Sequence, residues 1–548
     1  MTSEEPLIAG TVPASQDQIN KTANSTDVVF VESETLELTL DDKVDRLLNE
    51  IHGSGRFSCF AFFALVTGMN ATGYFFYLLS YLTLQPKYYK CVFTDPQPLD
   101  PEAACIDDNI CSDRVVSYEI DWSSIYSIHN WVEKLDLICC PGWKVGMMGS
   151  MVFVGWVVTL PWVPRLSDMY GRKMIFNIGM LIDLAMFIIM FFTTKIDSMI
   201  MVTFMFGLAT TIRVNIGFVY MMELMPKRNQ TFYGSAYNVL ESSVLLLGTL
   251  YFWFVSKQWI YFTLFGFGLQ IFSVITIQFL PESPRLMVEL GRLDEAKASF
   301  EKIAKWNGQE LHWNEEDFRR TATIENSSKT GQRPLSYWLK QKRILINLVV
   351  MTLFWLTTSF NFYLIQFLLT SFEQVYLTTI YSCASDMLAY VSAALVFKCL
   401  GVKKSQLLGF TIASLGGVII LIFGLSHQDY WYFPVMVLFA KYGVTLSFGV
   451  NYISNAYMFP TLFAATALGF CNTVARLFSA LSPIFAQMDE PLPMILFTGS
   501  SMITLTFVFC LQVPNSSPDE LLNKLPVGPV ESKQLETDGT LESEQAAN

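Results

Sequence analysis

The segment from residue 174 to residue 193 reads MIFNIGMLIDLAMFIIMFFT and is almost entirely apolar. About 18 apolar residues with few charges are enough to cross a bilayer core of roughly 30 Å. Lipid offers no hydrogen-bond partners to backbone amides, so a segment of this kind must form a helix. The segment therefore predicts a transmembrane helix.

The same pattern recurs on both sides of this segment along most of the chain. About twelve apolar runs are long enough to cross a membrane, near residues 58–82, 145–163, 174–193, 198–221, 233–255, 258–280, 345–370, 375–397, 405–425, 430–449, 463–485 and 493–512. The chain is 52% apolar and only 15% charged, whereas soluble domains are about 45–50% apolar and about 25% charged. We therefore predict an all-α membrane protein with twelve transmembrane helices.

Lys and Arg residues gather in alternate loops between the predicted spans. They lie at Arg165, Arg172 and Lys173, at Lys227 and Arg228, throughout 285–343, and at Lys398, Lys403 and Lys404. The positive-inside rule makes these loops cytoplasmic, so both termini are expected inside. The polar stretches 1–37 and 513–548 are predicted to be disordered cytoplasmic tails. No signal-peptide core precedes the first span, which we expect to direct insertion.

A long loop, residues 85–140, separates the first two spans and is expected outside. It contains half of the ten cysteines, namely Cys91, Cys105, Cys111, Cys139 and Cys140. Cysteines gathered in an external loop indicate a disulfide framework. Because five is odd, at least one is free, paired with Cys59 or bonded to another chain. The alternative for Cys139 and Cys140 is a pair of free thiols at a helix mouth. The loop has no N-x-[ST] sequon, so we expect no glycan there.

Three short motifs each occur twice, at nearly constant spacing, which indicates an internal repeat. Gly171 opens Gly-Arg-Lys after the second span, and Gly401 opens Gly-Val-Lys-Lys after the eighth. Two pairs of prolines at span ends, Pro226 with Pro460 and Pro281 with Pro514, are separated by almost the same length of chain as the two glycines. Transporters are often built from two such halves. We predict six-helix halves at 38–280 and 345–512, joined by a cytoplasmic helical linker at 281–344.

Several motifs resemble one family of carriers. Residues 166–173, LSDMYGRK, resemble the major facilitator loop G-x-L-S-D-R-x-G-R-K, and residues 281–285, PESPR, resemble the segment after the sixth helix of sugar porters and organic-ion carriers. The long Cys-rich loop, Asp41-Asp42 before Gly53–Phe57, and the stretch TVARLFSALSP at 473–483 are similar to organic cation, anion and carnitine transporters. The chain resembles this solute carrier family 22-like group from about residue 40 to residue 515.

The resemblance implies a major facilitator fold and a cytoplasmic gate made by Asp168, Arg172 and Glu223. The sequence also departs from the family pattern. Met169 replaces an expected Arg, Gln230 replaces another, and residues 457–464, YMFPTLFA, lack both charges of the usual E-x-F-P-T-x-x-R. These losses indicate either an altered conformational balance or a member that no longer transports.

Four charged residues inside the predicted spans stand out as candidates: Arg213, Glu241, Asp386 and Arg476. Charge in a membrane is costly, so such residues tend to face the bundle interior and to be paired or functional. The resemblance places Arg476 where the anion and carnitine branches have Arg, and the guanidinium fork suits a carboxylate. Asp386 fits the place of an acidic residue kept across the family. The alternatives are structural pairing of Arg476 with Asp386 or Glu241, and snorkelling of Arg213 to the lipid headgroups.

Aromatic and polar residues complete the predicted substrate site. Tyr390 matches a tyrosine of the carnitine branch, and the seventh span carries Asn361 and Tyr363 among many aromatics. In the family this helix lines the cavity and contacts ammonium groups through cation–π interactions. The alternative for most of its aromatic residues is a structural role in lipid contact or helix packing.

The sequence contains no phosphate loop, HExxH or CxxC motif and no nucleophile elbow. We therefore expect no enzyme, no cofactor, no metal and no nucleic acid partner. The predicted function is a secondary or facilitative carrier of small organic ions that works by alternating access. An anion or a carnitine-like zwitterion is favoured over a cation, and a proton or sodium ion is considered as coupling ion. The alternative of another class is a non-transporting receptor or assembly subunit.

The family resemblance implies a multi-pass protein of the plasma membrane. The segment Glu4-Glu5-Pro6-Leu7-Ile8 is close to an acidic dileucine sorting signal. An endosomal or lysosomal membrane is therefore the alternative address.

Overall fold

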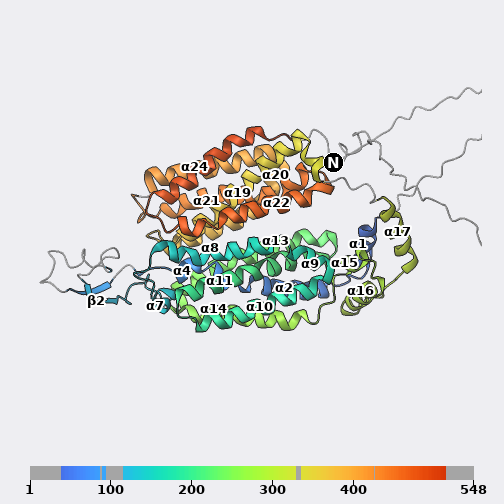
Figure 1. Cartoon of the computed structure of the whole chain (residues 1–548), viewed down its shortest axis with the longest axis horizontal. Coiled ribbons are helices and arrows are strands. Elements are labelled where there is room, and N and C mark those ends of the chain that lie inside the picture. Colours follow the sequence, from blue (N-terminus) through green and yellow to red (C-terminus); the bar gives the residue numbers. More distant parts are fainter. Residues whose placement is uncertain are drawn as a thin grey trace, which may run out of the picture.

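The computed structural model describes residues 39–86, 89–93, 111, 115–328, 335–424 and 426–513. Its long helices run side by side in two groups, one from α2 to α14 and one from α19 to α24 (Figure 1). The predicted tails and the sorting-like segment lie outside the described residues, apart from Val513.

The first group, the N-group, holds all the predicted spans of the first half. Its helices are α2 (Arg56–Ala71), α3 (Gly73–Phe76), α4 (Leu79–Leu82), α8 (Gly142–Thr159), α9 (Val163–Tyr170), α10 (Arg172–Phe192), α11 (Ile196–Thr210), the π-helical η1 (Thr211–Ile216), α12 (Gly217–Glu223), α13 (Lys227–Leu250), η2 (Tyr251–Val255) and α14 (Trp259–Ile277).

The second group, the C-group, holds the spans of the second half. Its helices are α19 (Lys342–Leu368), α20 (Val375–Ile419), η4 (Ile420–Gly424), α21 (Phe433–Met458), α22 (Thr461–Ser479), α23 (Ser482–Phe485), α24 (Leu492–Phe507) and η5 (Val508–Cys510). Between the groups the chain forms α15 (Pro284–Glu289), α16 (Leu293–Asn307), α17 (Glu315–Ser328) and α18 (Leu335–Leu339).

The described helices agree with twelve membrane spans. Ten are long and apolar enough to cross a membrane, and the bent pair α8 and α9, with a 49° angle between them, makes an eleventh. One of the ten, Val375–Gly424, has 50 residues. At about 1.5 Å per residue it would be about 75 Å long, more than twice a bilayer core of about 30 Å. It is interrupted at Gly401, so it makes two spans.

The interruption at Gly401 also supports the internal repeat. Gly171 and Gly401 both have positive φ, 105° and 72°. Residues with a Cβ rarely adopt this conformation, and glycine adopts it readily. Each glycine turns the chain between the second and third spans of its own half. The repeat seen in the sequence therefore corresponds to one backbone turn used twice. The domain boundaries that we placed around it stay predictions.

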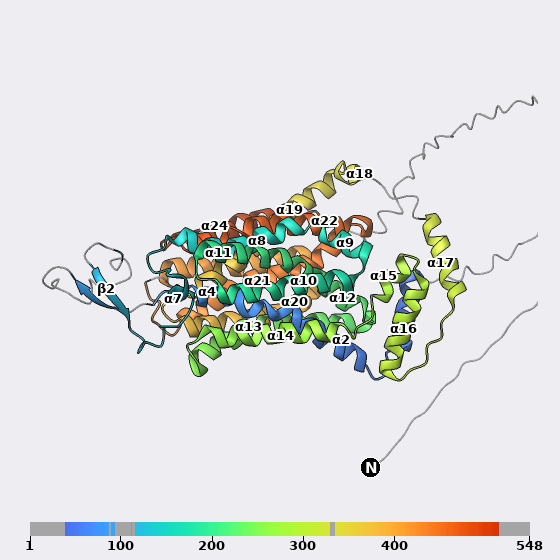
Figure 2. The same cartoon turned by 60° about the horizontal axis from the view of Figure 1, so that its bottom comes forward.

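The two ends of the bundle carry different elements. The antiparallel hairpin of β1 (Tyr89–Phe93) and β2 (Val115–Ile120) lies at one end. The helices α15, α16 and α17 and the amphipathic helix α1 (Leu40–Glu50) lie at the other (Figure 2). The linker end contains the basic loops, so the positive-inside rule predicts that it is the cytoplasmic end and that the hairpin end is the external end. The hairpin was not foreseen by the sequence, which predicted an all-α chain.

The external loop is anchored on the N-group by α7 (Trp131–Leu135). The side-chain amide of Asn130 donates hydrogen bonds to the carbonyl oxygens of Tyr81 and Leu84, each at 2.9 Å. The ammonium of Lys134 donates to the carbonyl oxygen of Met190 at 2.8 Å. These bonds satisfy backbone carbonyls at the ends of the helices they reach. This part of the loop is therefore fixed to the N-group.

Cys111 and Cys139 form a disulfide, and Cys140 is a free thiol. Cys105 lies outside the described residues, and the side chain of Cys91 in β1 is not described. The sequence predicted a disulfide framework without its connectivity, and one bond of that framework is now placed.

Candidate functional site

A small open cavity lies in the N-group, and its empty volume of about 370 Å³ includes open solvent at its mouth. Its lining residues Phe76 and Trp156 contact Tyr363 and Arg476 of the C-group. Its walls come from the first, second, fourth and fifth spans. Its lining residues are Met69, Asn70, Gly73, Phe76, Tyr77, Val152, Trp156, Thr210, Arg213, Val214 and Glu241. Two of the residues predicted from sequence, Arg213 and Glu241, therefore share one cavity.

Glu241 on α13 supplies the cavity with a negative charge. Its carboxylate accepts a hydrogen bond of 2.5 Å from the hydroxyl of Tyr77. Within the described part of the chain, no basic group lies within 4 Å of it. Arg213, which lines the same cavity, and Arg476 attract it only at longer range, and a carboxylate without a direct ion pair in a membrane interior is costly, which favours a binding role.

Arg476 on α22 supplies a positive charge from the C-group. Its guanidinium carbon lies 3.9 Å from the ring centroid of Trp156, a residue that also lines the cavity. One guanidinium nitrogen donates to the hydroxyl of Tyr363 at 2.7 Å. Cation–π contact of this kind stabilises a desolvated guanidinium. Among the residues that the structure describes, Arg476 has no acidic partner within 4 Å.

Glu241 and Arg476 occupy equivalent places in the two halves. They lie on the fifth and eleventh spans, each the fifth span of its own half. Their separation along the chain is nearly the same as that of the repeated motifs, such as Pro226 and Pro460. The internal repeat thus places one acidic and one basic residue at corresponding positions around the interface between the groups.

Arg213 sits in the π-helical turn η1 and is paired only loosely. Its Nε lies 4.0 Å from a carboxylate oxygen of Asp183, which also accepts a bond of 2.7 Å from the hydroxyl of Thr72. π-helical turns inside α-helices are often found at functional sites. The sequence analysis missed Asp183, although it stands as the one charged residue in the segment 174–193.

Asp386 is paired with a lysine that the sequence analysis also missed. The ammonium of Lys441 lies 3.0 Å from one carboxylate oxygen of Asp386, and the hydroxyl of Thr445 donates to the other at 2.7 Å. The side chain of Lys441 is fully buried. Both oxygens of Asp386 are therefore occupied, which favours a helix-linking role over direct substrate contact.

The charges inside the described spans balance. Away from the span ends, six charged side chains occur: Asp183, Arg213, Glu241, Asp386, Lys441 and Arg476. Asp386 and Lys441 form a close pair, and Asp183 and Arg213 form a loose pair at 4.0 Å. Glu241 of the N-group and Arg476 of the C-group form no ion pair within 4 Å among the described residues, although Arg213 and Arg476 attract Glu241 at longer range.

The remaining predicted substrate residues lie in different surroundings. Tyr363 meets Arg476 directly and packs on Phe153 of the N-group, with ring centroids 4.6 Å apart. The amide of Asn361 is fully buried and donates to the hydroxyl of Ser501 on α24 at 2.9 Å. Tyr390 is half-buried one turn after Asp386. The structure thus brings Tyr363 to the site, whereas Asn361 links two helices of the C-group.

The predicted gate residues form one cluster at the cytoplasmic end of the N-group. The guanidinium of Arg172 donates to Asp168 at 2.5 Å and to the hydroxyl of Ser167 at 2.6 Å. It also forms an ion pair of 3.1 Å with Glu223. Gln230, which stands where the family pattern has an Arg, donates to the carbonyl oxygen of Met222 at 2.8 Å. The loss of that charge leaves the Arg172 cluster intact.

Arg172→Lys is expected to reduce substrate transport about tenfold at unchanged surface abundance. A lysine ammonium is a point charge and does not reproduce the planar fork that reaches three partners, and a loss of about 1.4 kcal/mol corresponds to tenfold. Uptake at saturating substrate measures this. The matched control is Arg165→Lys, an exposed arginine on α9, which should transport like the wild type. Equal transport by both variants would contradict the gate assignment.

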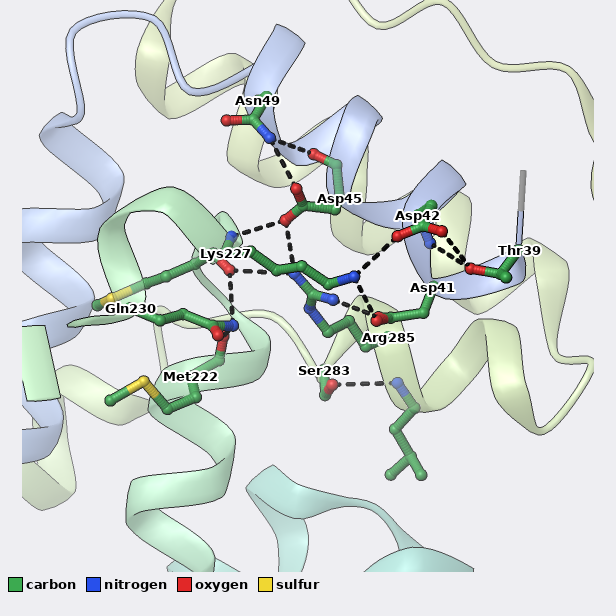
Figure 3. Close-up of polar contacts among 12 residues, drawn as sticks. Thr39, Asp41, Asp42, Asp45, Asn49, Met222, Lys227, Gln230, Ser283 and Arg285 are labelled. Carbon is green, nitrogen blue, oxygen red and sulfur yellow. Dashed lines mark hydrogen bonds and ion pairs between the residues drawn. The ribbon is translucent and has the colours of Figure 1, made fainter. Parts of the chain in front are cut away.

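A second charged cluster, the α1 clamp, holds helix α1 against the N-group (Figure 3). The ammonium of Lys227 bridges Asp41 at 2.8 Å and Asp42 at 2.9 Å. The guanidinium of Arg285 pairs with Asp41 and, at 2.9 Å, with Asp45. Burial opposes ionisation of Asp41, yet Lys227 and Arg285 outweigh it and hold the pKa of Asp41 below its usual value. The clamp joins α1 to the start of α13 and to α15.

Arg285→Ala is expected to destabilise the protein by about 2 to 4 kcal/mol, because it leaves Asp45 partly buried without its charge partner. The melting temperature of the purified protein in detergent measures this. The control Arg46→Ala removes an arginine on α1 that is 70% exposed and forms an exposed pair of 3.3 Å with Glu50, where about 0.5 kcal/mol or less is expected. Identical melting temperatures for the two variants would show that the clamp contributes little.

The two groups meet closely at the external end. The hydroxyl of Tyr376 on α20 donates to the carbonyl oxygen of Ile125 in the external loop at 2.9 Å. The hydroxyl of Tyr81 donates to that of Thr379 at 3.0 Å. The ring of Tyr376 also stacks on Trp253, with centroids 5.5 Å apart and planes 13° apart. These contacts close the external side between the groups.

Comparison with known proteins gives one matching family and many relatives. The family described as sugar (and other) transporter matches residues 60–521. Organic cation/carnitine transporter 2 of Homo sapiens is 25% identical over 403 residues, 70% of this chain and 69% of that protein. Solute carrier family 22 member 21 of Mus musculus is 26% identical over 398 residues, again 70% of this chain and 69% of that protein.

Solved structures of similar fold include two other transporters. The inward-open xylose transporter XylE from E. coli has a TM-score of 0.59 at 14% identity, covering 85% of this chain and 98% of that chain. A mutant of the nucleoside transporter NupG has a TM-score of 0.50 at 12% identity, covering 83% of this chain and all of that chain. At such low identity the likeness concerns the fold, which includes both helix groups.

Proposed function

The chain belongs to the sugar (and other) transporter family, as a solute carrier family 22-type transporter of organic solutes, and we propose that its substrate is a small organic zwitterion moved by alternating access. Such a substrate carries a carboxylate and an ammonium group separated by a short chain. In this proposal Arg476 binds the carboxylate and Glu241 binds the ammonium.

The observation that carries the proposal is the charge balance inside the spans. Glu241 and Arg476 form no ion pair within 4 Å among the described residues, although Arg213 and Arg476 both attract Glu241 at longer range. Glu241 and Arg476 also lie at repeat-equivalent positions. A neutral zwitterion supplies one counter-charge to each and leaves the total unchanged. An organic anion or cation would pair with one residue and leave the other without a direct charge partner, which is costly in a membrane interior.

The surroundings of the two charges suit this assignment. Trp156 lines the cavity and also contacts the Arg476 guanidinium, so one cavity wall reaches both residues. Tyr77 and Tyr363 each hold one of the charges through a hydroxyl. A substrate carboxylate would accept two parallel bonds from the guanidinium fork and replace the single bond to Tyr363. The names of the relatives include a carnitine transporter, which handles a molecule of this class.

Two alternative functions are each favoured by a particular observation. The Glu241–Tyr77 pair in the cavity favours an organic cation as the second candidate. The uncharged stretch 457–464 in the C-group favours a receptor-like member that does not transport. Against the latter, Arg172 of the N-group keeps its ion pairs with Asp168 and Glu223. We propose the plasma membrane as the location, with an endosomal or lysosomal membrane as the alternative.

Uptake by cells that express the protein tests the proposal. A labelled panel should include zwitterions, organic anions and organic cations, each with the wild type and with Arg476→Ala. Saturable uptake of a carboxylate-bearing zwitterion that is lost in the variant at equal surface abundance supports the assignment. Uptake of cations alone, indifferent to Arg476, would overturn the substrate class and leave the carrier. No uptake by well-folded protein would favour the receptor-like alternative.

A further inference from the structure

Lys441 lies in a set of acceptors that has the chemistry of a binding site for a monovalent cation. Its ammonium lies 3.0 Å from a carboxylate oxygen of Asp386 and 2.9 Å from the amide oxygen of Gln366. It also lies 4.8 Å from the ring centroid of Phe362. An ammonium has three donors and no acceptor. A carboxylate oxygen, an amide oxygen and an aromatic face thus surround the ammonium group.

The acceptor oxygens point toward the ammonium of Lys441, even though this orientation leaves the buried amide nitrogen of Gln366 without a hydrogen-bond partner among the described residues. Rotating the amide would present N–H groups to the ammonium, so the charge fixes the oxygen inward. Thr445 donates to the second oxygen of Asp386, which keeps the carboxylate in place. Three helices, α19, α20 and α21, contribute to the set.

We propose that Asp386, Gln366 and Phe362 form a monovalent-cation site that the chain fills permanently with the ammonium of Lys441. The tethered ammonium takes the place of a dissociable cation and holds the three helices together. It follows that removing the side chain of Lys441 opens a site for a small primary ammonium ion or for sodium. The stability of the C-group then depends on an external cation.

Lys441→Ala with added n-propylammonium tests this directly. The variant keeps Cβ, and propylammonium supplies atoms equivalent to the missing three carbons and the nitrogen. We expect the melting temperature of the purified variant to fall by about 5 to 10 °C, because a buried carboxylate loses its partner. Millimolar n-propylammonium chloride should restore most of the loss and leave the wild type unchanged. Sodium chloride should restore part of it.

The controls separate charge from simple filling of space. Neutral n-propanol has a similar shape and should restore nothing. Tetramethylammonium chloride has the charge but is too bulky and has no N–H donor, so it should also fail. Equal effects of propanol and propylammonium, or no effect of either cation, would overturn the proposal.

A second pair of variants covers the case in which Lys441→Ala does not accumulate. Lys441→Met and Asp386→Asn each remove one charge of the pair and should both lower the amount of folded protein. The double variant Lys441→Met with Asp386→Asn removes both charges and should regain most of it. A double variant no better than the single ones would contradict a cation held by charge compensation.

The stability measurements do not depend on the proposed function. A transport consequence does rest on it: wild-type uptake should not change when sodium is replaced by N-methylglucamine. Strong sodium dependence of the wild type would contradict a site already filled by Lys441. Rescue of stability without uptake of any substrate would count against the proposed function and leave the cation site supported.

Discussion

Arg476→Gln is expected to lower the uptake of a zwitterionic substrate by about 100-fold or more and to spare a cation of the same size. The substitution removes the guanidinium that would hold the carboxylate. Breaking a buried, hydrogen-bonded charge pair costs about 3 to 5 kcal/mol, and every 1.4 kcal/mol corresponds to about tenfold. Initial rates of uptake for a zwitterion and for its carboxamide analogue measure the effect.

Glu241→Gln is the mirror control. It should lower uptake of the same zwitterion and spare an anion in which carbon replaces the ammonium nitrogen. Arg476→Lys keeps the charge and loses the planar fork, so an intermediate loss is expected. If both neutralising variants lost all three substrates equally, the two residues would have a structural role and the charge-pairing account would be contradicted.

A disulfide between Gly142→Cys and Gln487→Cys is expected to stop transport almost completely, with recovery on reduction. A Cβ added at Gly142 would lie 3.4 Å from Cβ of Gln487, close to the distance of about 3.5 to 4.5 Å found in disulfides. The bond would join α8 of the N-group to the chain just after α23 of the C-group. Alternating access requires these external ends to separate, so a covalent link should prevent the cycle.

The experiment should be made in a Cys140→Ser background, because the free thiol of Cys140 lies two residues from Gly142. Each single cysteine variant serves as a control and should transport with and without oxidant. Crosslinking is scored by a shift in electrophoretic mobility after cleavage between the groups. A fully crosslinked protein that still transports at the wild-type rate would contradict separation at this end.

The membrane spans could be predicted because a long run of apolar residues is visible in the sequence itself. A run such as 174–193 is set by the thickness of the bilayer, and no tertiary contact is needed to recognise it. The repeat was also visible, since Gly171 and Gly401 are needed for the same positive-φ turn in each half. The sequence named Arg476 for a substrate carboxylate and Tyr363 for an ammonium group, and the two side chains are in direct contact in the structure.

Asp183 and Lys441 were missed for a physical reason. Each is one charge within a long apolar run, which changes the hydropathy of the run very little. Their structural role depends on ion-pair partners on other helices, Arg213 for Asp183 and Asp386 for Lys441, which are distant in sequence. Once these pairs are known, Glu241 and Arg476 are the charges inside the described spans that form no ion pair within 4 Å. Sequence alone had ranked Asp386 beside them, because it could not show that both of its oxygens are occupied.

Disulfide connectivity and the external hairpin could not be predicted either, because both depend on contacts between residues that are distant in sequence. Five cysteines in one loop permit many pairings, and spacing does not distinguish Cys139 from its neighbour Cys140. The bond of Cys139 to Cys111 depends on how the loop returns to the N-group through α7. The path of such a loop is set by its packing against the helices.

Counterflow by the purified protein in liposomes tests the central claim most directly. Liposomes loaded with an unlabelled ammonium carboxylate would be diluted into the labelled compound, with its carboxamide and its carbon analogue tested in parallel. Our account predicts saturable counterflow of the zwitterion, at least tenfold above either analogue, and none with Arg476→Gln. Counterflow that favours either analogue, or that persists in Arg476→Gln, would contradict the claim that Glu241 and Arg476 bind the two ends of a zwitterion.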